Sequence, residues 1–184
     1  DDDSNNNGDD GTISLFASNN SDGNITVYDV TSSQSITSKT LITTSTAADG
    51  VYYNSNTESV FQASRSGNNL EGFMDVDNLV SGSVINVGVA GTSDMMSPRE
   101  VAVNGNLFVV ADNADVDGDT NTPDGRLYVY TMSNGSFSLR NVITTNFKLW
   151  GITFNGNDLY AVVDATNELA IFTNFLSNTS TTTL

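Results

Sequence analysis

The most specific chemical pattern in the sequence is a run of acidic and amide side chains between residues 112 and 126. Oxygen-bearing side chains recur at positions 1, 3, 5, 7, 9 and 12 of a loop that starts at Asn113, with glycine at position 6. These residues are Asn113, Asp115, Asp117, Asp119, Asn121 and Asp124. Alternate oxygens turn inward when a chain wraps a cation, and glycine permits the sharp turn at position 6. Carboxylates so close together repel one another strongly unless a cation lies between them.

This spacing resembles the D-x-[DN]-x-[DN]-G calcium loop. It departs from that loop at Asn113, which carries no charge, and at Asp124, which is shorter than the usual Glu. No helical pattern flanks the loop, so it is similar to the calcium loops of propeller or solenoid hairpins rather than to an EF-hand. The resemblance implies calcium as the bound ion, and an exposed loop kept soluble by its charge is the alternative. The absence of His and Cys excludes zinc and copper as the natural metal.

The composition limits the classes of partner. The chain has 184 residues, 6 Lys plus Arg against 22 Asp plus Glu, and a net charge of −16. Such a surface repels phosphate backbones and anionic lipids, so nucleic acid and membrane surfaces are not expected as partners. No run approaches the roughly 20 apolar residues of a membrane helix, so membrane insertion is not expected. The lack of His also removes the commonest general base.

The elements that position the acidic loop belong to a repeat of short alternating runs rich in Val, Ile, Tyr, Phe and Thr, which is typical of strands. One run carries an aromatic residue at Phe16, Phe61, Phe108 and Tyr160, and the next carries one at Tyr28, Phe73, Tyr130 and Phe172. The two aromatics lie 12 residues apart in the first, second and fourth units and 22 apart in the third. The acidic loop is therefore interpreted as an insertion of ten residues into one hairpin.

Four strands per unit and a period of about 45–50 residues are typical of the blades of a β-propeller. The predicted fold class is all-β, with about four blades of four antiparallel strands at approximately 13–47, 48–92, 97–146 and 149–184. Residues 1–12 are acidic and rich in Asp, Asn and Gly, and are expected to form a tether. The alternative is a degenerate cation loop, because Asp3, Asn5, Asn7 and Gly8 fall at metal-loop spacing. Over residues 13–176 the chain resembles the propeller proteins of the extracellular bacterial, surface lipoprotein-like type. That resemblance rests on the anatomy of the repeat, and it implies a secreted or cell-surface location.

The strand count does not close a ring in the usual way. The first unit lacks its first strand and the fourth lacks a clear fourth strand, which leaves 14 strands. We interpret the chain as about half of a larger propeller. A compact four-bladed ring in which residues 180–184 supply a strand is one alternative, and two chains that associate into one ring are another.

A few residues outside the acidic loop are candidates for ligand contact. Trp150 heads the first strand of the fourth unit and is expected to be a core residue, with a ligand-lining position as the alternative. Arg99 and Glu100 lie at a turn that would face the central opening of a propeller, where a structural ion pair is expected ahead of a ligand contact. Arg65 lies in the hairpin that corresponds to the acidic loop and has the same two interpretations.

These observations indicate a calcium-stabilised extracellular propeller that binds a protein or glycan, with no catalytic residues evident. Self-association that completes a ring is a further expectation. The alternative is a propeller enzyme, such as a lactonase-like or glycan-active hydrolase or lyase, whose catalytic residues lie partly outside this chain. A carboxylate pair suits glycan chemistry, but no pair stands out in the sequence.

Overall fold

The computed structural model describes residues 13–44, 48–74, 85–91, 94–115, 117–119, 121, 124–164 and 166–178. These residues form fourteen strands in four antiparallel sheets and one short helix, α1 (Phe175–Asn178). The all-β prediction is confirmed. The segments 1–12 and 180–184, which were expected to form a tether and a closing strand, lie outside the described residues. Within the described ranges, no helix is long and apolar enough to cross a membrane.

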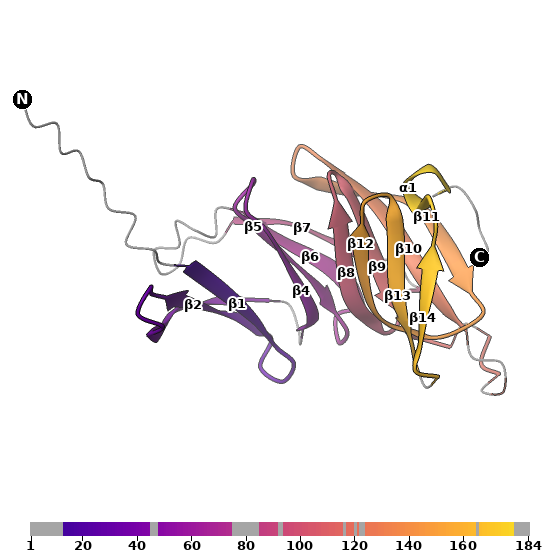
Figure 1. Cartoon of the computed structure of the whole chain (residues 1–184), viewed down its shortest axis with the longest axis horizontal. Helices are drawn as coiled ribbons and strands as arrows, with labels where there is room; N and C mark the ends of the chain where they lie inside the picture. Colours follow the sequence, from indigo (N-terminus) through magenta and orange to yellow (C-terminus); the bar gives the residue numbers. More distant parts are fainter. Residues whose placement is uncertain are drawn as a thin grey trace, which may run out of the picture.

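The four sheets follow one another along the chain. Sheet 1 contains β1 (Ile13–Asn19), β2 (Asn24–Val30) and β3 (Ile36–Thr43). Sheet 2 contains β4 (Ala48–Asn54), β5 (Ser59–Ser64), β6 (Asn69–Met74) and β7 (Ile85–Gly91). Sheet 3 contains β8 (Pro98–Asn104), β9 (Leu107–Asp112), β10 (Gly125–Ser133) and β11 (Ser136–Thr145). Sheet 4 contains β12 (Leu149–Asn155), β13 (Asp158–Val163) and β14 (Glu168–Phe172). Figure 1 shows sheet 1 at the left, sheet 2 beside it, and sheets 3 and 4 together at the right.

Repeated turns show which strands are equivalent. The loops 20–23, 65–68 and 164–167 each join two paired strands with four residues. The last residue of each has positive φ, at Gly23, Asn68 and Asn167. Glycine and asparagine tolerate this left-handed conformation better than other residues. Strand β1 therefore corresponds to β5 and β13, the second strands of their sheets, which confirms that sheet 1 has no first strand among the described residues.

Three apolar clusters hold neighbouring sheets together. Sheets 1 and 2 enclose a cluster that includes Ile25, Ile42 and Val60. Between sheets 2 and 3, the rings of Phe61 and Phe108 meet edge to face with centroids 4.6 Å apart. The third cluster lies between sheets 3 and 4 and also receives Phe175 of α1. Each inner sheet is thus covered on both faces, which is how a twisted sheet with two apolar faces becomes stable.

The outer faces of sheets 1 and 4 are not covered by the described residues. Leu15 of sheet 1 is 49% exposed, and Leu169 of sheet 4 is 58% exposed. A compact four-bladed ring would bury both faces against each other. The described residues therefore form an open row of four sheets rather than the closed ring that the sequence left open as an alternative.

β-Bulges recur at equivalent positions. In sheets 2, 3 and 4 the pairing of the first and second strands shifts at the start of the first strand, between Ala48 and Val51, between Pro98 and Glu100, and between Leu149 and Ile152. A bulge leaves its extra residues unpaired and redirects their side chains. These three bulges therefore place Asp49, Arg99 and Trp150 at one end of three successive sheets.

Candidate functional site

The acidic loop joins β9 to β10, and counted between the paired residues Asp112 and Arg126 the connection is 113–125, of which Gly125 is already the first residue of β10. Thirteen residues here replace the four of the equivalent loops, so the loop is nine residues longer and not ten. The prediction of ten was wrong because it assumed that Phe61 and Phe108 are equivalent. In the sheet registers, Phe61 is equivalent to Val109, and Phe108 is equivalent to Val60.

The loop is anchored where it leaves β9. The buried carboxylate of Asp112 accepts hydrogen bonds from the backbone N–H groups of Met96, Ser97 and Ala114, at 2.9, 2.7 and 3.1 Å. The backbone N–H of Asn113 donates to the carbonyl of Ser97 at 3.0 Å. A carboxylate that accepts several backbone hydrogen bonds fixes the segments that carry them. Asp112 thus ties the start of the loop to the segment that precedes β8.

Three of the six residues that the sequence marked as metal ligands come together. One carboxylate oxygen from each of Asp115, Asp117 and Asp124 lies within 4.8 Å of the others. Calcium binds oxygen ligands at about 2.3–2.6 Å, so oxygens on opposite sides of the ion lie up to about 5 Å apart. The spacing therefore fits a hard cation. The Lys148 ammonium lies 3.6 Å from Asp115 Oδ2 and partly balances the charge of the cluster.

The other three residues have different partners. The Asn113 side-chain amide donates to Asp164 at 3.1 Å, which directs it toward sheet 4. The Asp119 carboxylate accepts from the backbone and the side-chain amide of Asn121 at 3.0 and 2.9 Å, and both residues are exposed. The structure thus groups the carboxylates of Asp115, Asp117 and Asp124, while Asn113 is directed to Asp164 and Asp119 pairs with Asn121.

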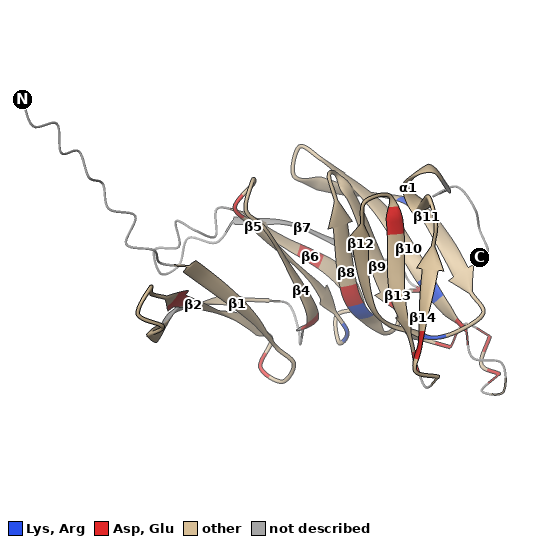
Figure 2. Ribbon diagram, viewed as in Figure 1, with Lys and Arg blue, Asp and Glu red and all other residues tan. Residues whose placement is uncertain are grey.

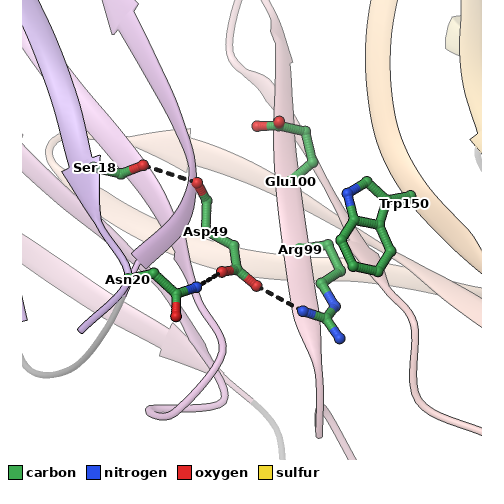
Figure 3. Close-up of a pocket in the computed structure, with 6 residues that line it drawn as sticks. All are labelled: Ser18, Asn20, Asp49, Arg99, Glu100 and Trp150. Atoms are coloured by element: carbon green, nitrogen blue, oxygen red, sulfur yellow. Dashed lines mark hydrogen bonds and ion pairs between the residues drawn. The ribbon is translucent and has the colours of Figure 1, made fainter.

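A second group of polar residues lines a cavity of about 230 Å³ at the same end of the sheets (Figure 3). It is built around the three bulge residues. Other strands and loops contribute the rest, and the full lining is Ser18, Asn20, Asp49, Arg99, Glu100 and Trp150. Because Pro98 pairs with Asp112, the acidic loop starts next to Arg99 in the ladder of sheet 3. The two groups are neighbours at one end of the fold.

The bulge residues form a chain of contacts across three sheets. Arg99 Nη1 donates to Asp49 Oδ2 at 3.0 Å, and the Arg99 guanidinium carbon lies 4.6 Å from the centroid of the Trp150 ring. Asn20 donates through its side-chain amide to Asp49, and Ser18 Oγ donates to the Asp49 carbonyl at 2.9 Å. Cation, carboxylate, amide and aromatic groups therefore meet in one pocket (Figure 3).

Glu100 lies beside this group and also lines two further cavities, of about 390 and 250 Å³. Burial raises the pKa of the Glu100 carboxyl, the hydrogen bond from the Val101 N–H opposes that shift, and the Asp49 carboxylate adds to it. The Glu100 side chain occupies the space beside Gly50, where any Cβ would collide with it. Glu100 is thus held at the junction of sheets 2, 3 and 4.

The sequence placed Trp150 in the core, and this prediction was wrong. The Trp150 side chain is 52% exposed and lines the pocket. The bulge between Leu149 and Ile152 is the reason, since it turns Trp150 away from the interior. The ion pair expected for Arg99 is present, with Asp49 as its partner. Arg65 lies 3.7 Å from the same carboxylate and donates to Asn20 at 3.2 Å.

Acidic residues greatly outnumber basic residues on the molecule. Figure 2 shows acidic residues on all four sheets and far fewer basic ones. Arg99 and Lys148 each lie against a carboxylate of one of the two polar groups. A cation or an uncharged polar ligand would therefore meet less repulsion at this end of the fold than an anion would.

Comparison with known proteins concerns the fold. No family model matches the chain. No curated protein matches its sequence. A protein of unknown function from Desulfotomaculum acetoxidans has a similar structure, with a TM-score of 0.68 and 13% identity over 89% of this chain and 51% of the other. A candidate 6-phosphogluconolactonase from Bacteroides uniformis gives 0.61 and 14%, over 89% and 50%. The WD40 beta propeller domain of Doa1 gives 0.56 and 14%, over 88% and 48%.

The chain thus spans about half the length of these solved structures. At 13–14% sequence identity the similarity concerns the fold alone and says nothing about activity. Together with the repeated four-stranded antiparallel sheets, it shows that the chain has a β-propeller fold.

Proposed function

We propose that the protein is an extracellular, calcium-stabilised propeller module that binds a small polar ligand, best matched by a sugar of a glycan. The observation that carries this proposal is the convergence of the bulge residues Asp49, Arg99 and Trp150 in one pocket. Bulges are frequent next to functional sites because they redirect side chains. The first and second strands of sheets 2, 3 and 4 stay paired, while the bulges present three different side chains from equivalent positions. Such an arrangement suits ligand recognition.

The chemistry of the pocket supports a sugar. A sugar ring offers hydroxyl groups to carboxylates, amides and guanidinium groups and an apolar face to an aromatic ring. The pocket holds all of these, in Asp49, Asn20, Arg99 and Trp150. Its volume of about 230 Å³ is below the roughly 300–1,000 Å³ of sites for drug-sized ligands, so a single sugar ring is the appropriate scale.

The acidic loop supports the calcium part of the proposal. Asp115, Asp117 and Asp124 supply three carboxylate oxygens at a spacing that suits calcium. A calcium ion needs six to eight oxygens, so water would complete much of the shell. Extracellular calcium modules work with dissociation constants of about 10⁻⁴–10⁻³ M, which suits a site with few protein ligands and a location outside the cell.

Sugar binding can be tested by the fluorescence of the protein, because Trp150 is the sole tryptophan. We expect that neutral monosaccharides and short glycans, titrated to about 50 mM, change the emission and that Arg99→Ala abolishes the response. Arg140→Ala on strand β11 is the control, because it removes a positive charge away from the pocket. An emission spectrum that stays constant across a glycan panel would refute the sugar assignment.

Calcium binding can be tested separately by thermal unfolding. Calcium at millimolar concentration should raise the Tm of EDTA-treated protein, because a ligand that binds only the native state stabilises it. The double variant Asp115→Asn/Asp117→Asn should lose the shift, and Asp22→Asn, in the short loop of sheet 1, should keep it. A shift below about 1 °C for the unaltered protein would contradict the calcium site.

A lactonase-like enzyme is the second candidate. It is favoured by the likeness to candidate 6-phosphogluconolactonases and by Glu100, whose carboxyl has a raised pKa in a cavity. Perturbed carboxyl groups in clefts are frequent in catalytic sites. We expect a pH-stat assay with sugar lactones to separate the two candidates. Hydrolysis that Glu100→Gln abolishes would favour the enzyme, and a rate equal to that without protein would favour the binding module.

A further inference from the structure

The last sheet presents an apolar face to solvent. On sheet 4, the face that points away from sheet 3 carries Val162, Leu169 and Ile171, which are 48%, 58% and 50% exposed. Val162 pairs with Leu169, and Ile171 pairs with Tyr160, so these side chains form one contiguous patch over β13 and β14. We call this surface the leading face of sheet 4.

The equivalent residues in the preceding sheet are fully covered. In the strand registers, Val162, Leu169 and Ile171 correspond to Ala111, Leu127 and Val129 of sheet 3. Those three residues are 0% exposed and are packed against sheet 4. The same positions therefore form an inter-sheet core in sheet 3 and a solvent-exposed patch in sheet 4. A face with this composition is built to be covered by another sheet.

The first sheet presents the complementary face. On sheet 1, the face that points away from sheet 2 carries the exposed side chains Ile13, Leu15, Ile36 and Leu41. Leu15 is 49% exposed, but its equivalents Val60, Phe108 and Leu159 are at most 1% exposed. We call this surface the trailing face of sheet 1. Every junction inside the chain joins a leading face to the trailing face of the next sheet.

We propose that two copies of this chain close a ring of eight sheets, in which the leading face of sheet 4 of each copy packs on the trailing face of sheet 1 of the other. This contact repeats the type of junction that already joins sheets 1 to 2, 2 to 3 and 3 to 4 within one chain. A head-to-tail contact of this kind ends in a closed ring when the rotation per copy completes a full turn.

The number of sheets supports two copies rather than three or more. The described sheets match about half of each solved propeller-like structure, including 48% of the WD40 beta propeller domain of Doa1. Propellers typically contain about four to eight sheets, so two copies with four described sheets each give a ring within that range, and three copies would exceed it. Because each copy carries a net charge of −16, the contact must overcome like-charge repulsion, and added salt should strengthen it.

The experiment is sedimentation equilibrium of the full 184-residue chain from about 1 to 100 µM, in 0.15 and 0.5 M NaCl. We expect a species of twice the 19.5 kDa chain mass, with a higher dimer fraction at 0.5 M NaCl. Leu169→Lys and Leu15→Lys should each give monomers that keep the circular dichroism spectrum of the original chain. Leu139→Lys, on the exposed edge strand β11, is the matched control and should stay dimeric.

Mixing provides a second measurement that does not depend on the folding of a single variant. Leu15→Lys leaves the leading face of sheet 4 intact, and Leu169→Lys leaves the trailing face of sheet 1 intact. An equimolar mixture of the two should regain one contact and form a heterodimer. Three outcomes overturn the proposal: a chain that is monomeric at 100 µM, a dimer that only one of the two variants disrupts, and an open series of larger polymers.

Discussion

The guanidinium carbon of Arg99 lies 4.6 Å from the centroid of the Trp150 ring, so a cation from sheet 3 covers part of an aromatic face from sheet 4. The same guanidinium donates to Asp49 of sheet 2 at 3.0 Å. Arg99 therefore joins three sheets at one end of the fold. A cation above an aromatic face contributes about 0.5–2 kcal/mol depending on how dry the contact is.

Replacement of Asp49 tests this link. In Asp49→Ala, Arg99 loses its ion-pair partner. The pair is mostly buried, since the Arg99 side chain is 16% exposed and the Asp49 side chain is 15% exposed. We expect a loss of about 2 kcal/mol in the free energy of unfolding by urea, together with a change in Trp150 emission. Arg65→Ala removes a longer, more exposed contact with the same carboxylate, 3.7 Å, and should cost less than about 0.5 kcal/mol. Equal losses in the two variants would contradict the role given to Arg99.

Glu100 predicts a pH dependence of stability. Its pKa is raised in the folded protein, chiefly by burial, above the ordinary value of 4.5. The folded state therefore holds the proton more tightly, and the stabilisation from this group is complete below pH 4.5 and is lost as the pH rises through the folded pKa. At pH 7, Glu100→Gln should unfold at a higher Tm than the original protein, since the amide oxygen can still accept from Val101. Below pH 4 the difference should vanish, and a difference that is constant with pH would contradict the assignment.

Lys148 predicts a change in calcium affinity. Its ammonium lies 3.6 Å from Asp115 Oδ2, where it competes with a cation for the same carboxylate. A unit charge about 6 Å away in water contributes roughly 0.7 kcal/mol, so Lys148→Met should bind calcium about threefold more tightly. Isothermal titration with calcium at low ionic strength measures this. Lys39→Met changes the net charge by the same amount in another sheet, and an equal effect there would show only a general electrostatic response.

Asp112 predicts a large loss of stability. Its carboxylate accepts from the backbone N–H groups of Met96, Ser97 and Ala114, so Asp112→Ala leaves three donors without an acceptor. We expect about 3 kcal/mol less free energy of unfolding, measured in urea. The exposed Asp22 accepts from Asn19 in a turn, and Asp22→Ala should change stability by less than about 0.5 kcal/mol. A loss for Asp112→Ala as small as that for Asp22→Ala would show that the anchor contributes little.

Removal of the Tyr130 hydroxyl is expected to change stability in the opposite direction from removal of the Asp112 carboxylate. Tyr130 is 2% exposed, and within the described part of the chain its hydroxyl oxygen has no hydrogen-bond partner. A buried polar group without a partner is destabilising, so Tyr130→Phe should leave stability unchanged or raise it by up to about 1 kcal/mol. Urea unfolding distinguishes this from a hidden hydrogen bond, which would make the variant less stable.

Much of the fold follows from alternation and repetition in the sequence, because these reflect the faces that each strand buries. The four runs that carry Phe16, Phe61, Phe108 and Tyr160 all form strands as predicted, namely β1, β5, β9 and β13. The prediction was wrong where it took residues of the same type to be structurally equivalent. Phe61 and Phe108 look equivalent, yet their rings meet between adjacent sheets, because Phe61 is the third residue of β5 and Phe108 is the second residue of β9, and side chains alternate between the two faces of a strand.

The pocket was largely hidden from sequence reasoning for a related reason. Asp49, Arg99 and Trp150 share no residue type, and only the bulges that precede Val51, Glu100 and Ile152 bring them together. A signal was present, because each lies five residues before the closing Asn of its strand, which is Asn54, Asn104 or Asn155. The acidic loop was found because metal ligands are local in sequence. The sequence did not reveal that Asn113 contacts Asp164 or that Lys148 contacts Asp115, because in each pair the two residues lie far apart in the sequence.

The hairpin between β9 and β10 shows that this fold tolerates grafting. Its strands keep the same pairing as their equivalents although the connection grows from four residues to thirteen. Each doubling of a flexible loop costs only about 0.6 kcal/mol, so the longer connection costs about 1 kcal/mol. The loops 20–23, 65–68 and 164–167 occupy the equivalent place in their sheets. A peptide epitope or a lanthanide-binding tag inserted at any of them would be displayed at the same end of the molecule without a change in strand register.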